Sequence, residues 1–479
     1  MSGSGQSLGS RTLRGMAWAY GAYVGGRLLV LVQTAILARL LTPADFGLVA
    51  LALTFMVFLD TIKDMGLGNA LIISDPEETA TRAQTAFSWG VMIGVALMLV
   101  TAAAGPLAAW FFRAPGLTAL MAVFGVTFFV RSLGATHLAL ARKELNYRVR
   151  TMSELAEAVA RGVVGISLAL LGAGVWSLAI GFLCGTVVST VVLWSAVKFR
   201  PHAQITRTHL RSMVKFGGML TVIDVQSAFA YNLDYIFIGR VLGKSALGLY
   251  TMAFRLPELA VLNLANVAGD VLFPAYAAAD KERLRDTYLM ALRYTAMLTF
   301  PIAVALVVLA DPLIHVLFGS KWEQSIPVME LLTLQALATT LAIPCGTVYK
   351  VTGQAHILLW LAVPGIAILV VLLVIFTDQG IEAVALCGVA IHTAALPFTT
   401  LIASRQLRLP VLANVRAVVP ALVAAAAMTL VMVALDHALS APLLLIVAGT
   451  AAGMVVYVGL LWLLAGDDLR RLRRMAAPA

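Results

Sequence analysis

The chain has 479 residues, of which 61% are hydrophobic and 12% are charged, and its formal net charge is +10. Soluble domains carry roughly a quarter charged residues, so this amount of apolar side chain cannot be hidden in a water-soluble core. The composition therefore excludes a soluble globular protein and predicts a polytopic membrane protein.

Apolar runs recur from one end of the chain to the other, and each is long enough to cross about 30 Å of hydrocarbon as a helix. Helices are expected because a helix satisfies its own backbone groups, and the alternation of a barrel strand is absent. We predict an all-α protein whose crossings lie near residues 16–40, 48–73, 83–112, 117–141, 152–172, 174–198, 216–239, 248–276, 288–310, 327–349, 356–377, 380–403, 417–436 and 441–464. These are about fourteen transmembrane helices.

Basic residues distinguish the two sides of this predicted bundle. With a cytoplasmic N-terminus, most lysines and arginines outside the spans fall in inner loops and tails, as the positive-inside rule requires. The outer ends hold only Arg39, Arg113, Arg240, Lys244 and Lys321. Both termini are therefore predicted to be cytoplasmic. The same distribution explains the positive charge without a nucleic-acid partner, because no compact basic domain is present.

The predicted loops are too short to carry chemistry of their own. None exceeds about twenty residues, which leaves no room for an appended catalytic domain. The sequence contains no zincin pattern, nucleophile elbow or Cys/His metal spacing. Gly243-Lys244-Ser245 resembles the end of a phosphate-binding loop, but the leading glycine would fall at Ile238. We expect neither an enzyme nor a bound metal or cofactor.

One short motif occurs twice. LARLLTPADFGLVALA (37–52) and IGRVLGKSALGLYTMA (238–253) share five residues when Arg39 is aligned with Arg240. Six predicted crossings separate the copies, which indicates parallel repeats that form two similar lobes around a cleft. In each copy we expect an outer hairpin. In the first copy, Thr42-Pro43 breaks the chain and Asp45 lies in the turn before a helix that begins at Gly47; residues 240–248 do the same in the second copy.

Ionisable residues inside the spans point to a wet surface, because each costs roughly 2.5–3.5 kcal/mol in hydrocarbon. At 100° per residue, polar residues share one face on three of the predicted helices. The three faces hold Asp60, Lys63 and Asp64; Asp224, Ser227, Tyr231, Asp234 and Tyr235; and Arg255, Glu258, Asn263, Asn266 and Asp270. The spacings of Glu157 and Arg161 and of Arg255 and Glu258 fit either mutual neutralisation or contact with a ligand.

Three arginines differ from these pairs. Arg27, Arg131 and Arg293 have no acidic residue three or four positions away. Arginine binds phosphate bidentately and stays charged, so these side chains suit an anionic headgroup. The alternative is an ion pair with a carboxylate from another helix, such as Asp60 or Asp234.

A family resemblance follows from these residues. LARLLTPADFGLVALA, DMGLGNALI (64–72) and NLDYIFIGRVLGKSALGLYTMA (232–253) resemble the polysaccharide transporter branch of the MOP superfamily, the Wzx-type flippases of lipid-linked sugars. The resemblance implies two six-helix lobes and a final helix pair. The corresponding boundaries are a cytoplasmic extension at 1–15, an N-lobe at 16–200, a linker at 201–215, a C-lobe at 216–403, extra helices at 404–464 and a basic tail at 465–479.

The resemblance also implies a function in the bacterial inner membrane. The protein would move undecaprenyl-diphosphate-linked oligosaccharides to the periplasmic leaflet by alternating access, for surface polysaccharide synthesis. Protons or sodium ions are candidate coupling ions, and polysaccharide polymerase and export machinery are candidate partners. Three alternatives remain open: a lipid II-type flippase, a MATE-like exporter, and a membrane polymerase or ligase acting on the same lipid-linked sugars.

This picture assigns roles to thirteen residues. The diphosphate would bind Arg27, Arg131, Arg293 and Arg255; sugar hydroxyls would meet Tyr231, Asn232, Tyr235, Asn263 and Asn266; and ion coupling would involve Asp60, Asp64, Asp224 and Asp234.

Overall fold

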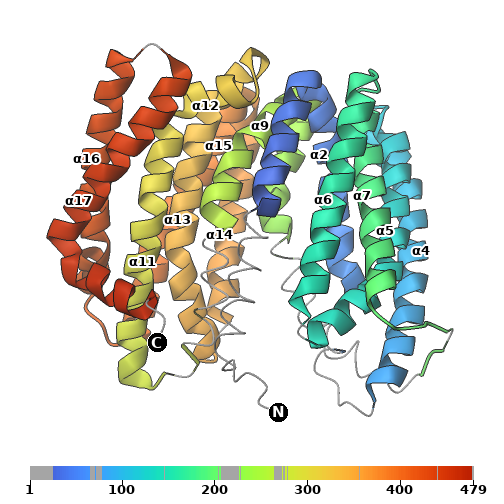
Figure 1. Ribbon diagram of the computed structural model, residues 1–479, viewed down its shortest axis with the longest axis horizontal. Helices are drawn as coiled ribbons and strands as arrows, with labels where there is room; N and C mark the ends of the chain where they lie inside the picture. The colour runs from blue at the N-terminus through green and yellow to red at the C-terminus, as the bar shows by residue number, and fades with distance from the viewer. Residues whose placement is uncertain are drawn as a thin grey trace, which may run out of the picture. The chain divides into compact units, whose positions relative to one another are not determined.

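The computed structural model is helical throughout its regular structure (Figure 1). It describes residues 25–64, 71, 78–144, 146–202, 204–206, 226, 228–263, 272, 276–277, 279–354, 356–439 and 441–476. Among these residues, ten helices are long and apolar enough to cross a membrane. The chain forms two compact units, residues 1–248 and 249–479.

The first unit follows the predicted crossings closely. Its described helices are residues 25–40, α2 (Pro43–Asp64), α4 (Thr79–Phe111), α5 (Leu117–Lys143), α6 (Tyr147–Leu170), α7 (Val175–Ala196) and residues 228–241. α4 packs along α5 and α6 along α7, while α5 also contacts α7 and α2. α6 is not among the ten apolar helices, because charged residues recur along it.

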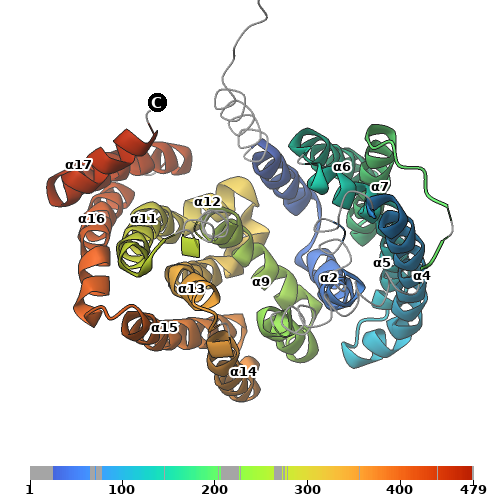
Figure 2. The ribbon, with the colours of Figure 1, turned by 90° about the horizontal axis from the view of Figure 1, so that it is seen from below.

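The second unit contains the remaining elements. They are α9 (Lys244–Pro257, which begins in the first unit), the π-helix η1 (Glu258–Leu262), α11 (Lys281–Val308), α12 (Ala310–Leu317), η2 (Ser320–Ser325), α13 (Ile326–Val351), α14 (His356–Phe376), η3 (Thr377–Gln379), α15 (Ile381–Gln406), α16 (Val411–Ala438) and α17 (Pro442–Ala476). α16 and α17 lie side by side in both ribbon views (Figures 1 and 2).

One stretch expected to be a loop is structured instead. Residues 311–326 form α12 and the 3-10 helix η2. Phe318 and Trp322 are fully buried there. Their burial explains why this connection is ordered. Removing two large aromatic side chains from solvent contributes favourable free energy that a solvated loop would lack.

α2 begins four residues earlier than the predicted start at Gly47. Pro43 occupies its first helical position, where a missing N–H costs nothing. The Thr42 hydroxyl donates to Asp45 Oδ2 at 2.6 Å, and the Asp45 N–H donates back to Thr42 Oγ1 at 3.3 Å. Asp45 is thus part of a cap that starts the helix, and does not lie in a preceding turn.

The two copies of the repeated motif contact each other within the first unit. A Cβ added to Gly47 would collide with the Lys244 carbonyl oxygen and lie 2.9 Å from the Gly248 nitrogen. A Cβ added to Gly248 would collide with the Pro43 carbonyl oxygen and lie 3.0 Å from the Gly47 nitrogen. Pro43 and Lys244 are equivalent in the repeat, so the crossing is reciprocal. Only glycine permits this backbone-to-backbone approach.

A short extended segment follows α7 and lies along α4. Gln84 bridges it twice, since its Nε2 donates to the Arg200 carbonyl at 3.1 Å and its Oε1 accepts from the His202 N–H at 2.8 Å. The Gln204 N–H donates to Ser88 Oγ at 3.0 Å, and the Thr206 N–H donates to Thr85 Oγ1 at 3.3 Å. The backbone groups of residues 200, 202, 204 and 206 therefore bind side chains of α4, and we call residues 200–202 and 204–206 the strap.

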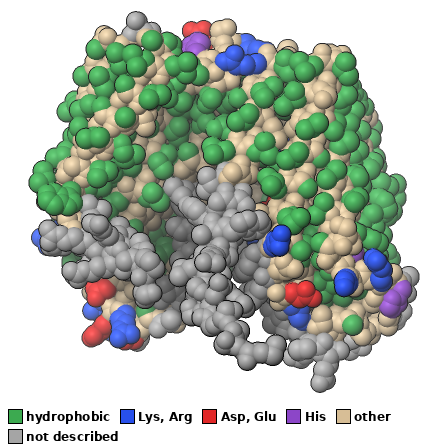
Figure 3. Space-filling model, in the orientation of Figure 1, with side chains coloured by type: hydrophobic (Ala, Val, Ile, Leu, Met, Phe, Trp, Pro, Cys, Tyr) green, Lys and Arg blue, Asp and Glu red, His purple; other side chains and the backbone are tan. Residues whose placement is uncertain are grey.

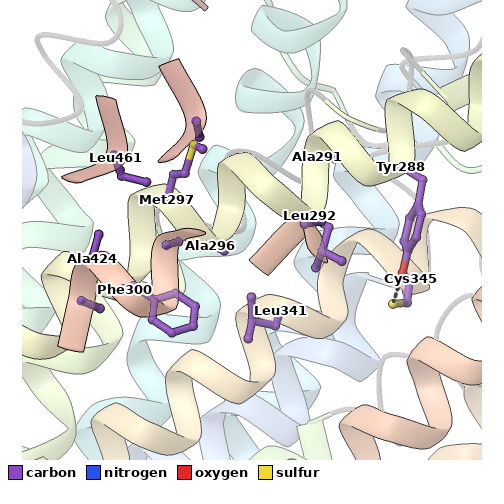
Figure 4. Close-up of a cluster of buried hydrophobic side chains, with 14 of the residues drawn as sticks. Tyr288, Ala291, Leu292, Ala296, Met297, Phe300, Leu341, Cys345, Ala424 and Leu461 are labelled. Atoms are coloured by element: carbon purple, nitrogen blue, oxygen red, sulfur yellow. Dashed lines mark hydrogen bonds between the residues drawn. The ribbon is translucent and has the colours of Figure 1, made fainter. Parts of the chain in front are cut away.

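The core of the second unit joins α11, α13, α16 and α17 (Figure 4). Met297 and Phe300 of α11 pack with Leu341 of α13, Ala424 of α16 and Leu461 of α17. One polar chain crosses this core: Tyr288 Oη donates to Asn414 Oδ1 at 2.8 Å, and Asn414 Nδ2 donates to Ser404 Oγ at 2.6 Å. Tyr288 Oη also lies 3.4 Å from Cys345 Sγ.

The surface is that of a membrane protein. On the face shown in Figure 3, hydrophobic side chains cover the described helices along their length, whereas the visible charged side chains lie mostly towards the helix ends. α14 is the extreme case, because Trp360, Val363 and Val374 are all at least 60% exposed. Such a helix is stable only against another apolar phase.

Candidate functional site

Four ionised side chains from three helices meet in the first unit. Arg131 Nη1 of α5 donates to Asp60 Oδ2 of α2 at 3.1 Å. Arg161 Nη2 donates to Glu157 Oε1 at 2.7 Å, within α6. Arg131 Nη2 lies 3.9 Å from Glu157 Oε1 and so links the two pairs. We call Asp60, Arg131, Glu157 and Arg161 the four-charge network.

The network is partly open to its surroundings. Two guanidinium groups lie beside two carboxylates, and the four side chains are between 20% and 35% exposed. Arg131 lies near the middle of α5, and Glu157 lies near the middle of α6. Ionised groups at such a depth are stable only when they face protein partners or water. The network is therefore a polar site inside an otherwise apolar bundle.

One aromatic ring of α7 supports both arginines. The Cζ atom of Arg161 lies 4.4 Å from the centroid of the Phe182 ring, and that of Arg131 lies 5.4 Å from it. Both distances are within the range of cation–π attraction, which strengthens when the cation is desolvated. The ring thus lies within cation–π range of both positive charges.

Two glycines on α7 bring α6 to this position. A Cβ on Gly181 would lie 2.9 Å from the carbonyl oxygen of Arg161. A Cβ on Gly185, one turn further, would lie 2.8 Å from the carbonyl oxygen of Glu157. The α6 backbone therefore packs closely against the Gly-x-x-x-Gly surface of α7 at Glu157 and Arg161. Phe182 lies between the two glycines in sequence.

The helix at residues 25–40 fixes α6 from another direction. Gln33 is buried, and its Nε2 donates to the carbonyl of Ala158 at 2.9 Å. Its side chain occupies the space that a Cβ on Gly162 would need. Two helices, α7 and the helix at residues 25–40, thus contact the α6 backbone next to Glu157 and Arg161.

The structure brings together two of the residues proposed from sequence, Asp60 and Arg131. Of the two interpretations of Arg131, the pairing with Asp60 from another helix is the one observed. Arg27 is exposed on the helix at residues 25–40. Tyr231 is 66% exposed, and Asn232 Nδ2 donates to the carbonyl of its own helix at Ala228. Asp234 Oδ1 accepts from the N–H of Tyr235 at 2.9 Å.

Three other proposed residues lie in the second unit. Arg255 pairs with Glu258 at 3.1 Å, as its spacing allowed. This pair spans the junction where α9 becomes the π-helix η1 after Pro257. Asn263 follows η1, and Arg293 lies on α11, which packs against η1. Asp224 and Asn266 lie outside the described residues, as does the side chain of Asp64.

Three members of the site were not assigned a role from sequence. The spacing of Glu157 and Arg161 fits either mutual neutralisation or contact with a ligand, and Phe182 was not considered. The available signal was the spacing of Gly181 and Gly185, which indicates a close helix contact and places Phe182 at it.

Comparison with known proteins agrees with this architecture. A profile of the family described as Polysaccharide biosynthesis protein matches residues 36–327. The succinoglycan biosynthesis transport protein ExoT of Rhizobium meliloti is 28% identical over 97% of this chain and 95% of its own length. The lipopolysaccharide biosynthesis protein WzxC of Escherichia coli is 27% identical over 73% of this chain and 72% of its own length.

Solved structures show the same fold at lower identity. The lipid II flippase MurJ, in an inward closed conformation, aligns with a TM-score of 0.78 over 95% of this chain and all of that chain, at 15% identity. An inward-facing MATE transporter of the MOP superfamily aligns with a TM-score of 0.64, covering 80% of this chain and 94% of that chain, at 17% identity.

Because this profile spans more than half of the chain, the protein belongs to the polysaccharide biosynthesis protein family.

Proposed function

We propose that this protein is a flippase that moves undecaprenyl-diphosphate-linked oligosaccharide repeat units from the cytoplasmic to the periplasmic leaflet of a bacterial inner membrane. The product would be a surface polysaccharide such as exopolysaccharide, capsule or O-antigen. The protein acts as a transporter and not as an enzyme.

The names of the relatives support this proposal. They belong to the synthesis of lipopolysaccharide, succinoglycan and, in Bacillus subtilis, teichuronic acid. The relatives are named for different polymers, so the names support a role in polysaccharide synthesis and do not identify one particular sugar. A transport protein is named explicitly in one case.

The observation that carries the proposal is the four-charge network. A diphosphate and several sugars can cross hydrocarbon only along a polar path. Polar and charged side chains there replace water around the headgroup and lower the free energy of its desolvation. Arg131 and Glu157 place ionised groups near the middle of their helices, in contact with partners on neighbouring helices. An apolar helix bundle with only structural tasks gains nothing from charges at this depth.

The remaining assignments are part of the same proposal. Two six-helix lobes would rock around a central cavity, with both termini in the cytoplasm and a final helix pair beside them. Arginines would hold the diphosphate, and polar and aromatic side chains would meet the sugars. Carboxylates would exchange a proton or sodium ion. The residues concerned are Arg27, Arg131, Arg255 and Arg293; Tyr231, Asn232, Tyr235, Asn263 and Asn266; and Asp60, Asp64, Asp224 and Asp234.

Deletion of the gene tests the proposal directly. Surface polymer should disappear, and lipid-linked oligosaccharide should accumulate on the cytoplasmic side of the membrane. Both defects should be reversed by the wild-type chain supplied in trans. Normal surface polymer in the deletion strain would refute the proposal.

Single substitutions test the arginine assignments. Arg27→Ala, Arg131→Ala and Arg293→Ala should each reduce polymer export at normal protein levels, because each removes a charge proposed to face the diphosphate. Arg150→Ala is the control, since the Arg150 side chain is 44% exposed and forms an ion pair with Glu154, outside the network. Unchanged export in all three variants would remove the clamp from the proposal.

A lipid II-type flippase is the second candidate, because the fold aligns along the whole length of MurJ. The same deletion separates the two. Loss of a lipid II flippase would accumulate the peptidoglycan precursor and arrest growth, whereas loss of a polysaccharide flippase leaves the cell wall intact. A MATE-like exporter would instead alter drug sensitivity without affecting polymer.

A further inference from the structure

Arg131 and Arg161 form a pair that no ordinary packing requirement explains. They come from α5 and α6, and both lie over the ring of Phe182 on α7. Two guanidinium groups that contact the same ring repel each other unless anionic groups lie between or beside them. In the structure, Asp60 and Glu157 supply those anionic groups.

The contacts of Arg131 with the two carboxylates are loose. One guanidinium nitrogen donates a single hydrogen bond to Asp60 at 3.1 Å, and the other lies 3.9 Å from Glu157. Neither is the bidentate geometry in which arginine binds an oxyanion most strongly. Two separate anionic groups thus face one guanidinium, which is also how the two phosphoryl groups of a diphosphate would face it.

We propose that Arg131 and Arg161, stacked on Phe182, are an exchangeable anion site, in which the diphosphate of the lipid-linked substrate replaces Asp60 and Glu157. This proposal rests on the proposed function and assigns it a site. A diphosphate carries more charge and more acceptor oxygens than two carboxylates, so it satisfies both guanidinium groups more fully. Without substrate, the carboxylates keep the arginines neutralised and prevent two unpaired charges from standing inside the bundle.

The proposal explains why the site is built on close backbone contacts. Gly181 and Gly185 hold the α6 backbone against α7 at Arg161 and Glu157. Gln33 of the helix at residues 25–40 also binds α6, at the carbonyl of Ala158. Arg161 therefore stays over Phe182 whichever anion is bound, and the movable groups are the carboxylate side chains.

Binding of geranylgeranyl diphosphate to the purified full-length chain tests this. The exchange site predicts that Asp60→Asn and Glu157→Gln bind this probe several-fold more tightly than the wild type, because each removes a competing anion while keeping the shape of the side chain. Arg131→Ala and Arg161→Ala should weaken binding about tenfold or more, the loss expected for a charge-assisted hydrogen bond. Phe182→Leu should weaken it several-fold, since a ring that supports both cations is lost.

The direction in which the carboxylate variants change the affinity for the probe distinguishes the exchange site from a structural network. If the network only braces the helices, Asp60→Asn and Glu157→Gln leave an arginine unpaired, lower the melting temperature and do not tighten binding. Unchanged or weaker binding by both folded carboxylate variants overturns the proposal. It is also overturned if neither the wild type nor Asp60→Asn binds the probe. Where an alanine variant does not fold, Arg131→Lys and Arg161→Lys replace it and should still lose affinity, because lysine lacks the planar fork.

Two controls complete the experiment. Glu154→Gln removes an exposed carboxylate of α6 outside the network, and its affinity should equal that of the wild type. Geranylgeraniol, which lacks the diphosphate, should not respond to any of the variants. If the wild-type chain restores surface polymer but neither Asp60→Asn nor Glu157→Gln tightens binding, the exchange site is wrong and the flippase stands. If the wild-type chain restores no polymer, the function itself fails.

Discussion

At the residue scale, glycine determines how closely the helices of the first unit approach. Gly47 and Gly248 each lie against a carbonyl oxygen of the other motif copy. Gly181 and Gly185 do the same between α7 and α6. In each case the neighbour is backbone, which cannot turn aside as a flexible side chain would. A single methyl group is therefore enough to separate the helices.

We expect Gly47→Ala and Gly248→Ala to destabilise the protein by about 1–3 kcal/mol, the usual cost of overpacking. The measurement is the thermal unfolding of the purified protein in detergent, where the melting temperature should fall. Gly90→Ala is the matched control, because Gly90 lies inside α4 with no atom near the added Cβ. That variant should be neutral or slightly stabilised by the better helix propensity of alanine. Equal melting temperatures for all three variants would contradict the crossing.

The polar chain in the core of the second unit makes a second prediction. Tyr288→Phe removes the hydroxyl that donates to buried Asn414, and we expect a loss of about 1–3 kcal/mol in unfolding free energy. In a double-mutant cycle with Asn414→Ala, the two changes should not add, since each removes the same hydrogen bond; the expected coupling is about 0.5–3 kcal/mol. Additive losses would show that the bond does not contribute.

At the element scale, the strap shows how a connection can be fixed without regular structure. Backbone groups of Arg200, His202, Gln204 and Thr206 bind side chains of α4, so the strap is held by a helix face. The linker predicted at residues 201–215 thus begins as a segment attached to α4.

Gln84→Ala should release the start of the strap. It removes the acceptor of the His202 N–H and the donor to the Arg200 carbonyl, so amide exchange at His202 should become several-fold faster. Hydrogen exchange read by mass spectrometry on peptides covering 200–206 measures this. Ser195→Ala, which changes only a hydrogen bond within α7, should leave the rates unchanged. Equal rates in both variants would mean that the strap is held by other contacts.

Helix positions were well predicted where a long apolar run ends abruptly at polar residues. α5 was expected at 117–141 and spans Leu117–Lys143, and α14 was expected at 356–377 and spans His356–Phe376. α2 was expected from residue 48 and begins at Pro43, because Thr42 and Asp45 are polar residues that look like a loop in sequence and act as a cap. α12 and η2 were not predicted, because the charged residues Asp311 and Lys321 are typical of a solvated loop. The burial of Phe318 and Trp322 is not evident from the sequence.

The candidate site could be predicted only in part. Spacing along one helix indicated the pair of Glu157 and Arg161, and Asp60 was named as an alternative partner of Arg131. The contact of Arg131 with Glu157, and of both arginines with Phe182, depends on how three helices are rotated against each other. Residue spacing within a helix does not define that rotation; side-chain packing between helices does.

At the scale of the whole molecule, the arrangement of the chain in the membrane is still a prediction. Gly319 and Gly353 lie in short turns at opposite ends of α13, and the charge pattern places the first outside and the second inside. Alkaline phosphatase fused after Gly319 should therefore be active, and the same fusion after Gly353 should be inactive. Green fluorescent protein fused after Ala479 should fluoresce. An inactive fusion at Gly319 with an active one at Gly353 would invert the topology.

The reciprocal crossing of Gly47 and Gly248 also bears on how the two halves of the chain have diverged. Each glycine meets a carbonyl oxygen, and every amino acid supplies the same carbonyl oxygen. Proline at 43 can therefore stand where the other copy has lysine at 244 without loss of the contact. After an ancestral duplication, drift would be free at almost every position of the motif but not at the two glycines, so an ancient symmetry can persist in the backbone after it has nearly vanished from the side chains.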